Sequence, residues 1–114
     1  MDFNEYQTES RKTAKYTEGE AANFKGLPIY PVLGLVGEAG EVAEKMKKII
    51  RDNNGVIDQE RKDLLIKEIG DVLWYTAQLC TDLDLSMDDV AQTNLDKLFS
   101  RLERGKIQGD GDNR

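Results

Sequence analysis

The sequence predicts an all-α protein, because helical periodicity recurs along the chain and strand-type alternation of apolar and polar residues is absent. The chain has 114 residues, enough for one domain with a single core. Residues 1–105 are expected to form that domain as a four-helix bundle-type fold. Residues 106–114, KIQGDGDNR, are expected to be a flexible polar tail.

Composition narrows the possible functions. The net charge is −6 and the chain contains no histidine. Negative charge argues against nucleic-acid binding, and the lack of histidine removes the commonest general base and zinc ligand. The single Cys80 excludes an internal disulfide. No apolar run approaches the roughly 20 residues of a membrane-spanning helix and no signal peptide opens the chain, so a cytoplasmic protein without membrane association is expected.

The first two helices are placed by their end signals. Residues 4–16 form a short polar helix candidate, and residues 16–27 have no strong period and indicate a connection. Pro31 suits a first helical turn, because its missing N–H would have no partner there. A second helix is therefore expected from about residue 31 to Asp52, where Asn53-Asn54-Gly55 stops it.

The third and fourth helices begin at side chains that can cap them. Asp58 precedes a helix that is expected to run to about Asp82. Ser86, with Asp89 three residues later, resembles a capping box and indicates the start of a fourth helix that ends at Gly105. The short loop between the second and third helices makes them antiparallel neighbours.

One pattern occurs twice. Residues 35–42 read LVGEAGEV and residues 65–72 read LIKEIGDV, so both follow L-x-x-E-x-G-[E/D]-V at an offset of 30. On a helix this pattern places a glutamate at the edge of an apolar stripe and a second carboxylate about 60° further round. The stripes consist of Leu35, Ala39, Val42, Met46 and Ile49 in the second helix, and of Leu65, Ile69, Val72, Thr76, Leu79 and Leu83 in the third.

The carboxylates of the two patterns are candidate metal ligands. If the two stripes share a core, four carboxylates converge on a small volume, and their repulsion favours a bound cation. Ligands that are all oxygen select a hard ion such as Mg²⁺ or Mn²⁺. A single acidic pair is usually solvated, as we expect for Glu44, but two pairs at matching offsets favour a metal site. These candidates are Glu38, Glu41, Glu68 and Asp71.

The glycines of the two patterns are expected to have different roles. Gly34 lies on the carboxylate side of its helix, where the missing side chain could leave room for the ligand. Gly37, Gly40 and Gly70 lie away from that side, where they could allow another helix or protomer to approach closely.

These residues resemble the signature of the MazG-like, all-α nucleoside triphosphate pyrophosphohydrolases. The similar segments are GLVGEAGEVAEK, KEIGDVLWY and Asn94-Leu95-Asp96-Lys97-Leu98 followed by Arg101, within about residues 27–104. The resemblance implies a homodimer or homotetramer that hydrolyses an NTP or dNTP to the monophosphate and pyrophosphate with Mg²⁺. It implies attack of a metal-activated water on the α-phosphorus.

The resemblance also assigns roles to residues. It implies that Glu38, Glu41, Glu68 and Asp71 hold the metal, that Lys97 and Arg101 face the triphosphate, and that Asn94 contacts the substrate. The last three residues share one face of the fourth helix, at i, i+3 and i+7. Without histidine, Glu41 or Glu38 is expected to act as the base, unless the water ionises on the metal alone.

Two aromatic residues are left with open alternatives. Tyr75 lies four residues after Asp71 and is a candidate contact to the substrate base, although an aromatic residue on a helix often only packs. Trp74 is expected at a protomer interface. Base choice is expected to depend on residues 16–30. A helical module that binds nucleotides without turnover, and a helical interaction protein with a solvated acidic seam, are the alternatives to an enzyme.

Overall fold

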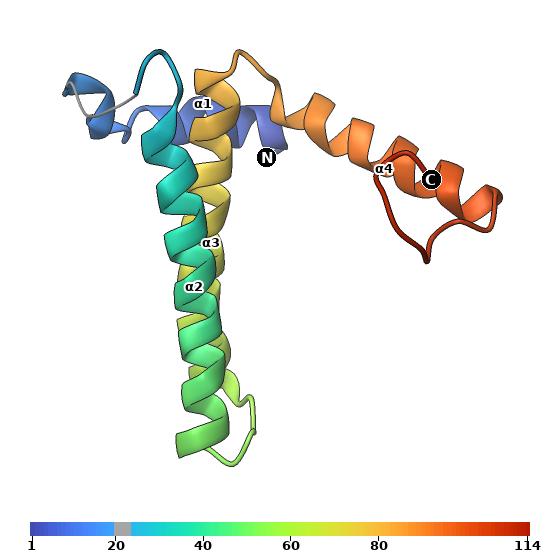
Figure 1. Ribbon diagram of the computed structural model, residues 1–114. Helices are drawn as coiled ribbons and strands as arrows, with labels where there is room; N and C mark the ends of the chain where they lie inside the picture. Colours follow the sequence, from blue (N-terminus) through green and yellow to red (C-terminus); the bar gives the residue numbers. More distant parts are fainter. Residues whose placement is uncertain (20–23) are drawn as a thin grey trace.

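The computed structural model describes residues 1–19 and 24–114 and confirms the all-α class (Figure 1). The described residues contain no β-strand. Within them, the α-helices are α1 (Phe3–Arg11), α2 (Ile29–Asp52), α3 (Gln59–Asp82) and α4 (Met87–Glu103), with a short 3-10 helix, η1 (Lys15–Glu18), after α1. The first helix, expected over residues 4–16, ends at Arg11, and η1 follows it. The expected connection over residues 16–27 therefore begins within η1, and its residues 20–23 lie outside the described residues.

Helices α2 and α3 form a long antiparallel hairpin. Each has 24 residues, which corresponds to a length of about 36 Å. The expected ends are confirmed: α2 stops where Asn54 and Gly55 adopt positive φ angles of 53° and 72°. The side chain of Asp58 caps α3 by accepting a 3.0 Å hydrogen bond from the Arg61 N–H. The hairpin brings the two repeated patterns side by side.

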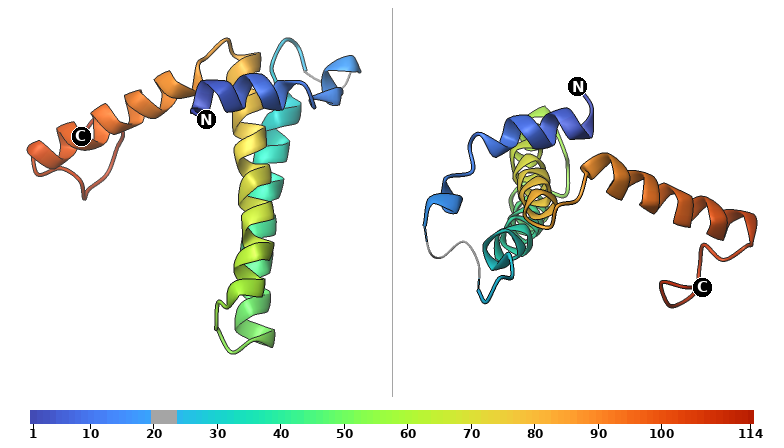
Figure 2. Two further views of the ribbon diagram at one scale, coloured as in Figure 1. Left: turned by 180° about the vertical axis from the view of Figure 1, so that it is seen from behind. Right: turned by 90° about the horizontal axis from the view of Figure 1, so that it is seen from above.

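Helix α1 crosses the end of the hairpin at which α3 finishes (Figure 2). Gln78 of α3 is fully buried there, and its amide nitrogen donates a 3.0 Å hydrogen bond to the Ser10 hydroxyl. Arg11 forms a 2.9 Å ion pair with Asp82. The small apolar core lies beside these contacts and consists of Ala77, Cys80 and Met87, with Tyr6 and Leu73 packed against it.

Helix α4 leaves this core and points away from the hairpin (Figures 1 and 2). Its expected start is confirmed, because the Ser86 hydroxyl accepts a 3.3 Å hydrogen bond from the Asp89 N–H. The helix packs against α1 through its first turns. The four helices of one chain therefore do not close into a bundle, since α4 does not lie along α2 and α3.

The chain is extended for its length and leaves much apolar surface uncovered. Its radius of gyration is 17.1 Å, against about 13 Å for a compact chain of about 100 residues. Of the expected stripes, Ile49 is buried, whereas Ile69 is 55% exposed. None of the helices in the described part of the chain is long and apolar enough to cross a membrane. Large exposed apolar side chains include Leu33, Val36 and Ile50 on α2, Ile66 on α3, and Leu95, Leu98, Phe99 and Leu102 on α4.

Candidate metal centre

Three of the four predicted carboxylates meet where α2 contacts α3. One carboxylate oxygen from each of Glu38, Glu68 and Asp71 lies within 4.8 Å of the others. Glu38 comes from α2, and the other two residues come from consecutive turns of α3. Glu38 and Glu68 are half-buried, whereas Asp71 is exposed. The repeated sequence pattern produces this acidic cluster, because it places a glutamate on the facing edge of each antiparallel helix.

The charges of the acidic cluster are only partly balanced. Burial raises the pKa of the Glu38 carboxyl, and the neighbouring charges of Asp71, Glu68 and Glu41 raise it further. Lys45 lies two turns after Glu38 on α2, and its ammonium group is 3.7 Å from a Glu68 oxygen. One cation therefore faces three carboxylates, and the remaining repulsion favours either a proton or a metal ion.

Glu41 does not join the acidic cluster. Its side chain is exposed on α2, one turn after Glu38 and about 60° round the helix. It is still close enough to act on the pKa of Glu38 through its charge. The structure thus brings together three of the four predicted ligands. The ligand role of all four residues stays a prediction.

The acidic cluster fits a small divalent cation. Its donors are all carboxylate oxygens, which Mg²⁺ and Mn²⁺ prefer. Two oxygens bound to one Mg²⁺ lie at most about 4.2 Å apart, and the oxygens of the cluster are within 4.8 Å. Small rotations of side chains on two fixed helices would complete the geometry.

Tyr75 fills the space beside Gly34. A Cβ atom at Gly34 would lie 2.1 Å from Cε1 of Tyr75, so an alanine cannot fit without moving the ring. The room that the sequence assigned to a ligand is therefore taken by an aromatic side chain. Tyr75 lies one turn from Asp71 on α3, and burial raises the pKa of its hydroxyl. The glycine thus positions an aromatic ring next to the acidic cluster.

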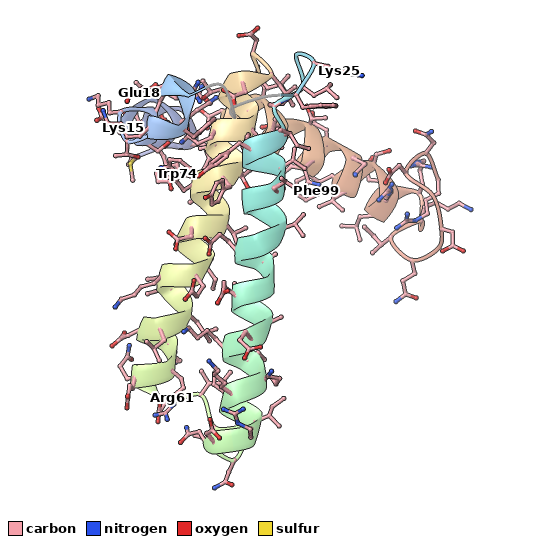
Figure 3. All side chains as sticks on the ribbon, turned by 60° about the vertical axis from the view of Figure 1, so that its left-hand side comes forward. Lys15, Glu18, Lys25, Arg61, Trp74 and Phe99 are labelled. Carbon is pink, nitrogen blue, oxygen red and sulfur yellow. The ribbon has the colours of Figure 1, made fainter. Side chains whose placement is uncertain are left out.

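Three further aromatic residues surround Tyr75. Trp74 and Tyr30 have ring centres 5.0 Å and 6.3 Å from it, and Tyr30 stacks on Tyr16 at 4.7 Å. The indole N–H of Trp74 donates a 2.8 Å hydrogen bond to Thr13, so this residue packs within its own chain, near α1 (Figure 3). Tyr16 and Tyr30 fall within residues 16–30, which were expected to determine base choice, but no sequence pattern singled them out. The one available signal was that Tyr30 lies one helical turn before Gly34.

Tyr16 is held in place by polar contacts to the C-terminal ends of α1 and α3. Its hydroxyl donates a 2.6 Å hydrogen bond to Asp82, and Arg11 donates a 3.0 Å bond to the same hydroxyl. Burial and the Asp82 carboxylate raise the pKa of Tyr16 to about 12. The aromatic cluster of Tyr16, Tyr30, Trp74 and Tyr75 is therefore fixed to α1 and α3 at the end of the hairpin that α1 crosses.

The predicted substrate residues of α4 lie apart from the acidic cluster. Asn94 and Lys97 are exposed on a helix that points away from the hairpin (Figure 1). Arg101 is only 5% exposed, and its guanidinium donates hydrogen bonds to the backbone oxygens of Gly111 (3.3 Å) and Asp112 (2.6 Å). Its Nε has no partner among the described residues. One chain alone therefore does not bring these three residues to the carboxylates.

The C-terminal tail folds back along α4. Arg104 donates a 2.7 Å hydrogen bond to the backbone oxygen of Arg114, and the Arg114 side chain donates to the backbone oxygens of Lys106, Ile107 and Gly111. The expected flexibility of residues 106–114 stays a prediction. In this arrangement the tail covers the guanidinium of Arg101.

Comparisons with known proteins connect the acidic cluster to a family. The sequence profile of the MazG nucleotide pyrophosphohydrolase domain matches residues 31–105, which include the acidic cluster and the predicted residues of α4. The chain is similar to the Gene 37 protein of Mycobacterium phage L5, with 52% identity over 115 residues and full coverage of both chains. No solved structure matches. The name of the phage protein states no activity.

The contact between Gly34 and Tyr75 predicts that adding one methyl group at residue 34 destabilises the fold. Replacing Gly34 with alanine should lower the free energy of unfolding by about 1–3 kcal/mol, because the ring of Tyr75 must move. A Cβ atom at Gly37, on the same helix, would meet only open space, so Gly37→Ala should raise it by about 0.5–1 kcal/mol. Urea unfolding measures both variants. Equal stability of the two would contradict the assigned packing.

The raised pKa of Glu38 predicts how stability depends on pH without metal. The unfolded chain releases this proton near the ordinary value of 4.5, whereas the folded chain releases it later. In EDTA, the free energy of unfolding should therefore fall as the pH rises through the folded pKa. Asp71→Asn removes one repelling charge and should make the fall smaller. Urea unfolding between about pH 4 and pH 8 tests this.

The matched control for that experiment is Glu44→Gln. Glu44 lies on the same hairpin and forms an ion pair with Lys47 at 2.9 Å, and that contact lowers its pKa. Removing the Glu44 carboxylate should not reduce the fall in the free energy of unfolding that accompanies rising pH. If Glu44→Gln and Asp71→Asn reduce the fall equally, the acidic cluster is not its source.

Proposed function

Because the chain belongs to the MazG nucleotide pyrophosphohydrolase family, we propose that it hydrolyses an NTP or dNTP to the monophosphate and pyrophosphate. The observation that carries this proposal is the acidic cluster. Glu38, Glu68 and Asp71 converge from two helices inside the region that matches the family. An acidic cluster with oxygen ligands suits a hard cation, and that cation suits a phosphate substrate.

Glu38, Glu68 and Asp71 would hold Mg²⁺, or Mn²⁺ as a substitute, and Glu41 would join them after a change of rotamer. A bound ion of this kind supplies positive charge to the phosphates and lowers the pKa of water. The protein would position the ion with carboxylates from α2 and α3, because these two helices pack against each other. The aromatic cluster lies next to this position, where the Tyr75 ring would contact the substrate base.

The proposed reaction is an attack of water on the α-phosphorus. A bond forms between the water oxygen and the α-phosphorus, and the bond to the oxygen that bridges to the β-phosphorus breaks. Pyrophosphate leaves with the bonding electron pair, and a carboxylate accepts the proton of the water. Glu41, which lies outside the acidic cluster, or Glu38 would be this base.

Assembly with further copies of the chain would complete the site. The apolar face of α4, formed by Leu95, Leu98, Phe99 and Leu102, is 38–64% exposed. Burying such a face supplies about 25 cal/mol for each Å². A homodimer or homotetramer would cover it and would allow Asn94 and Lys97 of one copy to face the acidic cluster of another. Arg101 would join them once the tail releases its guanidinium.

Activity is tested by pyrophosphate release with Mg²⁺ across all NTPs and dNTPs. At least one nucleotide should be hydrolysed, and Glu41→Gln and Asp71→Asn should each lower kcat by about 100-fold or more. Glu44→Gln is the control, because this carboxylate pairs with Lys47 and lies outside the acidic cluster. Inert nucleotides, or full activity in both variants, would contradict the proposal. Saturable nucleotide binding without release would indicate a binding module instead.

Assembly is tested by sedimentation. The chain has a mass of 12.9 kDa, and we expect particles of two or four chains. Phe99→Asp should weaken assembly at least tenfold, because it puts a charge on the apolar face of α4. Phe24→Asp is the matched control: Phe24 is 60% exposed and Phe99 57%, but Phe24 lies in a loop. A monomeric wild-type protein would contradict the assembly proposal.

A further inference from the structure

A positively lined pocket lies between α2 and α3, on the side of the acidic cluster away from α1. It has a volume of about 150 Å³. Three of its residues are cations and one is an anion, although the whole chain has a net charge of −6. Arg61 marks this end of the hairpin and Trp74 marks the other (Figure 3). The pocket is lined by Lys45, Lys48, Ile49, Asp52, Arg61 and Leu64.

The pocket is the last of three zones along one face of the α2–α3 hairpin. On α3, Tyr75, Asp71, Glu68, Leu64 and Arg61 follow one another at intervals of four, three, four and three residues, so they share one face. On α2, the facing residues include Gly34, Glu38, Lys45 and Ile49. This face of the hairpin therefore changes from aromatic to acidic to cationic along its length.

Lys45 connects the acidic cluster with the pocket. It lines the pocket and also lies 3.7 Å from Glu68, with a side chain that is 30% exposed. Glu68 and Arg61 are seven residues apart on α3, which corresponds to about 10 Å along the helix. The long side chains of Lys48 and Arg61 shorten this gap, so a phosphate chain that starts at the acidic cluster can reach them.

The cations of the pocket can exchange their present partners for an anion. Lys48 lies 3.8 Å from Glu44, and Arg61 lies 3.1 Å from Glu60 and 3.4 Å from Asp58. Exposed pairs of this kind contribute little to stability. Asp52, the one anion of the lining, is already held by Arg51 through two hydrogen bonds of 2.8 Å. Positive charge therefore remains available to a ligand.

We propose that this pocket is a pyrophosphate subsite, which receives the β- and γ-phosphates of the substrate and holds pyrophosphate after hydrolysis. The inference rests on the proposed function and specifies how the substrate lies. The base faces the aromatic cluster, the α-phosphate lies at the acidic cluster, and the rest of the chain points to Lys45, Lys48 and Arg61. The order of the aromatic, acidic and cationic zones matches the order of base, α-phosphate and β- and γ-phosphates along a nucleoside triphosphate.

The proposal is tested by calorimetric titration of the full chain with inorganic pyrophosphate, in the presence of Mg²⁺. Saturable binding is expected for the wild type. Lys48→Gln and Arg61→Gln should each weaken it about tenfold, because each removes a charged contact to phosphate. Lys47→Gln is the matched control: it is the adjacent lysine, pairs with the same Glu44, and lies outside the pocket. Circular dichroism checks that each variant is folded.

The outcomes separate this proposal from the proposed function. Undetectable binding, or equal effects of Lys47→Gln and Lys48→Gln, would overturn the subsite. If nucleotides are hydrolysed while neither Lys48→Gln nor Arg61→Gln weakens pyrophosphate binding, the subsite is wrong and the enzyme assignment stands. If pyrophosphate binds and both pocket variants weaken it, but no nucleotide is hydrolysed, the subsite stands as an anion site and the enzyme assignment fails.

Discussion

The repulsion among three carboxylates at the contact of α2 with α3 is the constraint on which this structure depends. Apolar residues in place of the half-buried Glu38 and Glu68 would remove this repulsion and the cost of burying charge. The chain instead holds the three carboxylates within 4.8 Å of one another, with Lys45 as a partial counter-charge. The burial of Glu38 adds to the cost and raises its pKa. A cation relieves this repulsion, so the least favourable feature of the free chain is the one that would bind the ligand.

The long hairpin makes this arrangement possible and leaves the chain incomplete. Two helices of 24 residues give one face of the hairpin the length for an aromatic cluster, an acidic cluster and a cationic pocket in sequence. They also leave apolar side chains such as Val36, Ile66 and Phe99 more than half exposed. Arg101 lies on α4, away from the hairpin, and is covered by the tail that follows this helix. In the proposed assembly, further copies would cover the apolar faces and bring α4 to the acidic cluster.

The sequence predicted most helix ends and the acidic cluster, because both depend on local signals. Asp58 and Ser86 are side-chain caps that act within one turn, and the two repeated patterns fix which edge of each helix carries a carboxylate. Contacts between distant segments were harder. Tyr16 lies in a short 3-10 helix outside any periodic pattern, so its stacking on Tyr30 had no local signal. The direction of α4 depends on its packing against α1. The spacing of apolar residues within one helix carries no information about that contact.

The most direct test of the central claim is a titration of the protein with Mn²⁺, followed by electron paramagnetic resonance of the free ion. We expect saturable binding to each chain, at least tenfold weaker binding in Asp71→Asn, and unchanged binding in Glu44→Gln. Weak binding that does not saturate, or equal binding by the wild type and Asp71→Asn, would show that the acidic cluster is not a metal site.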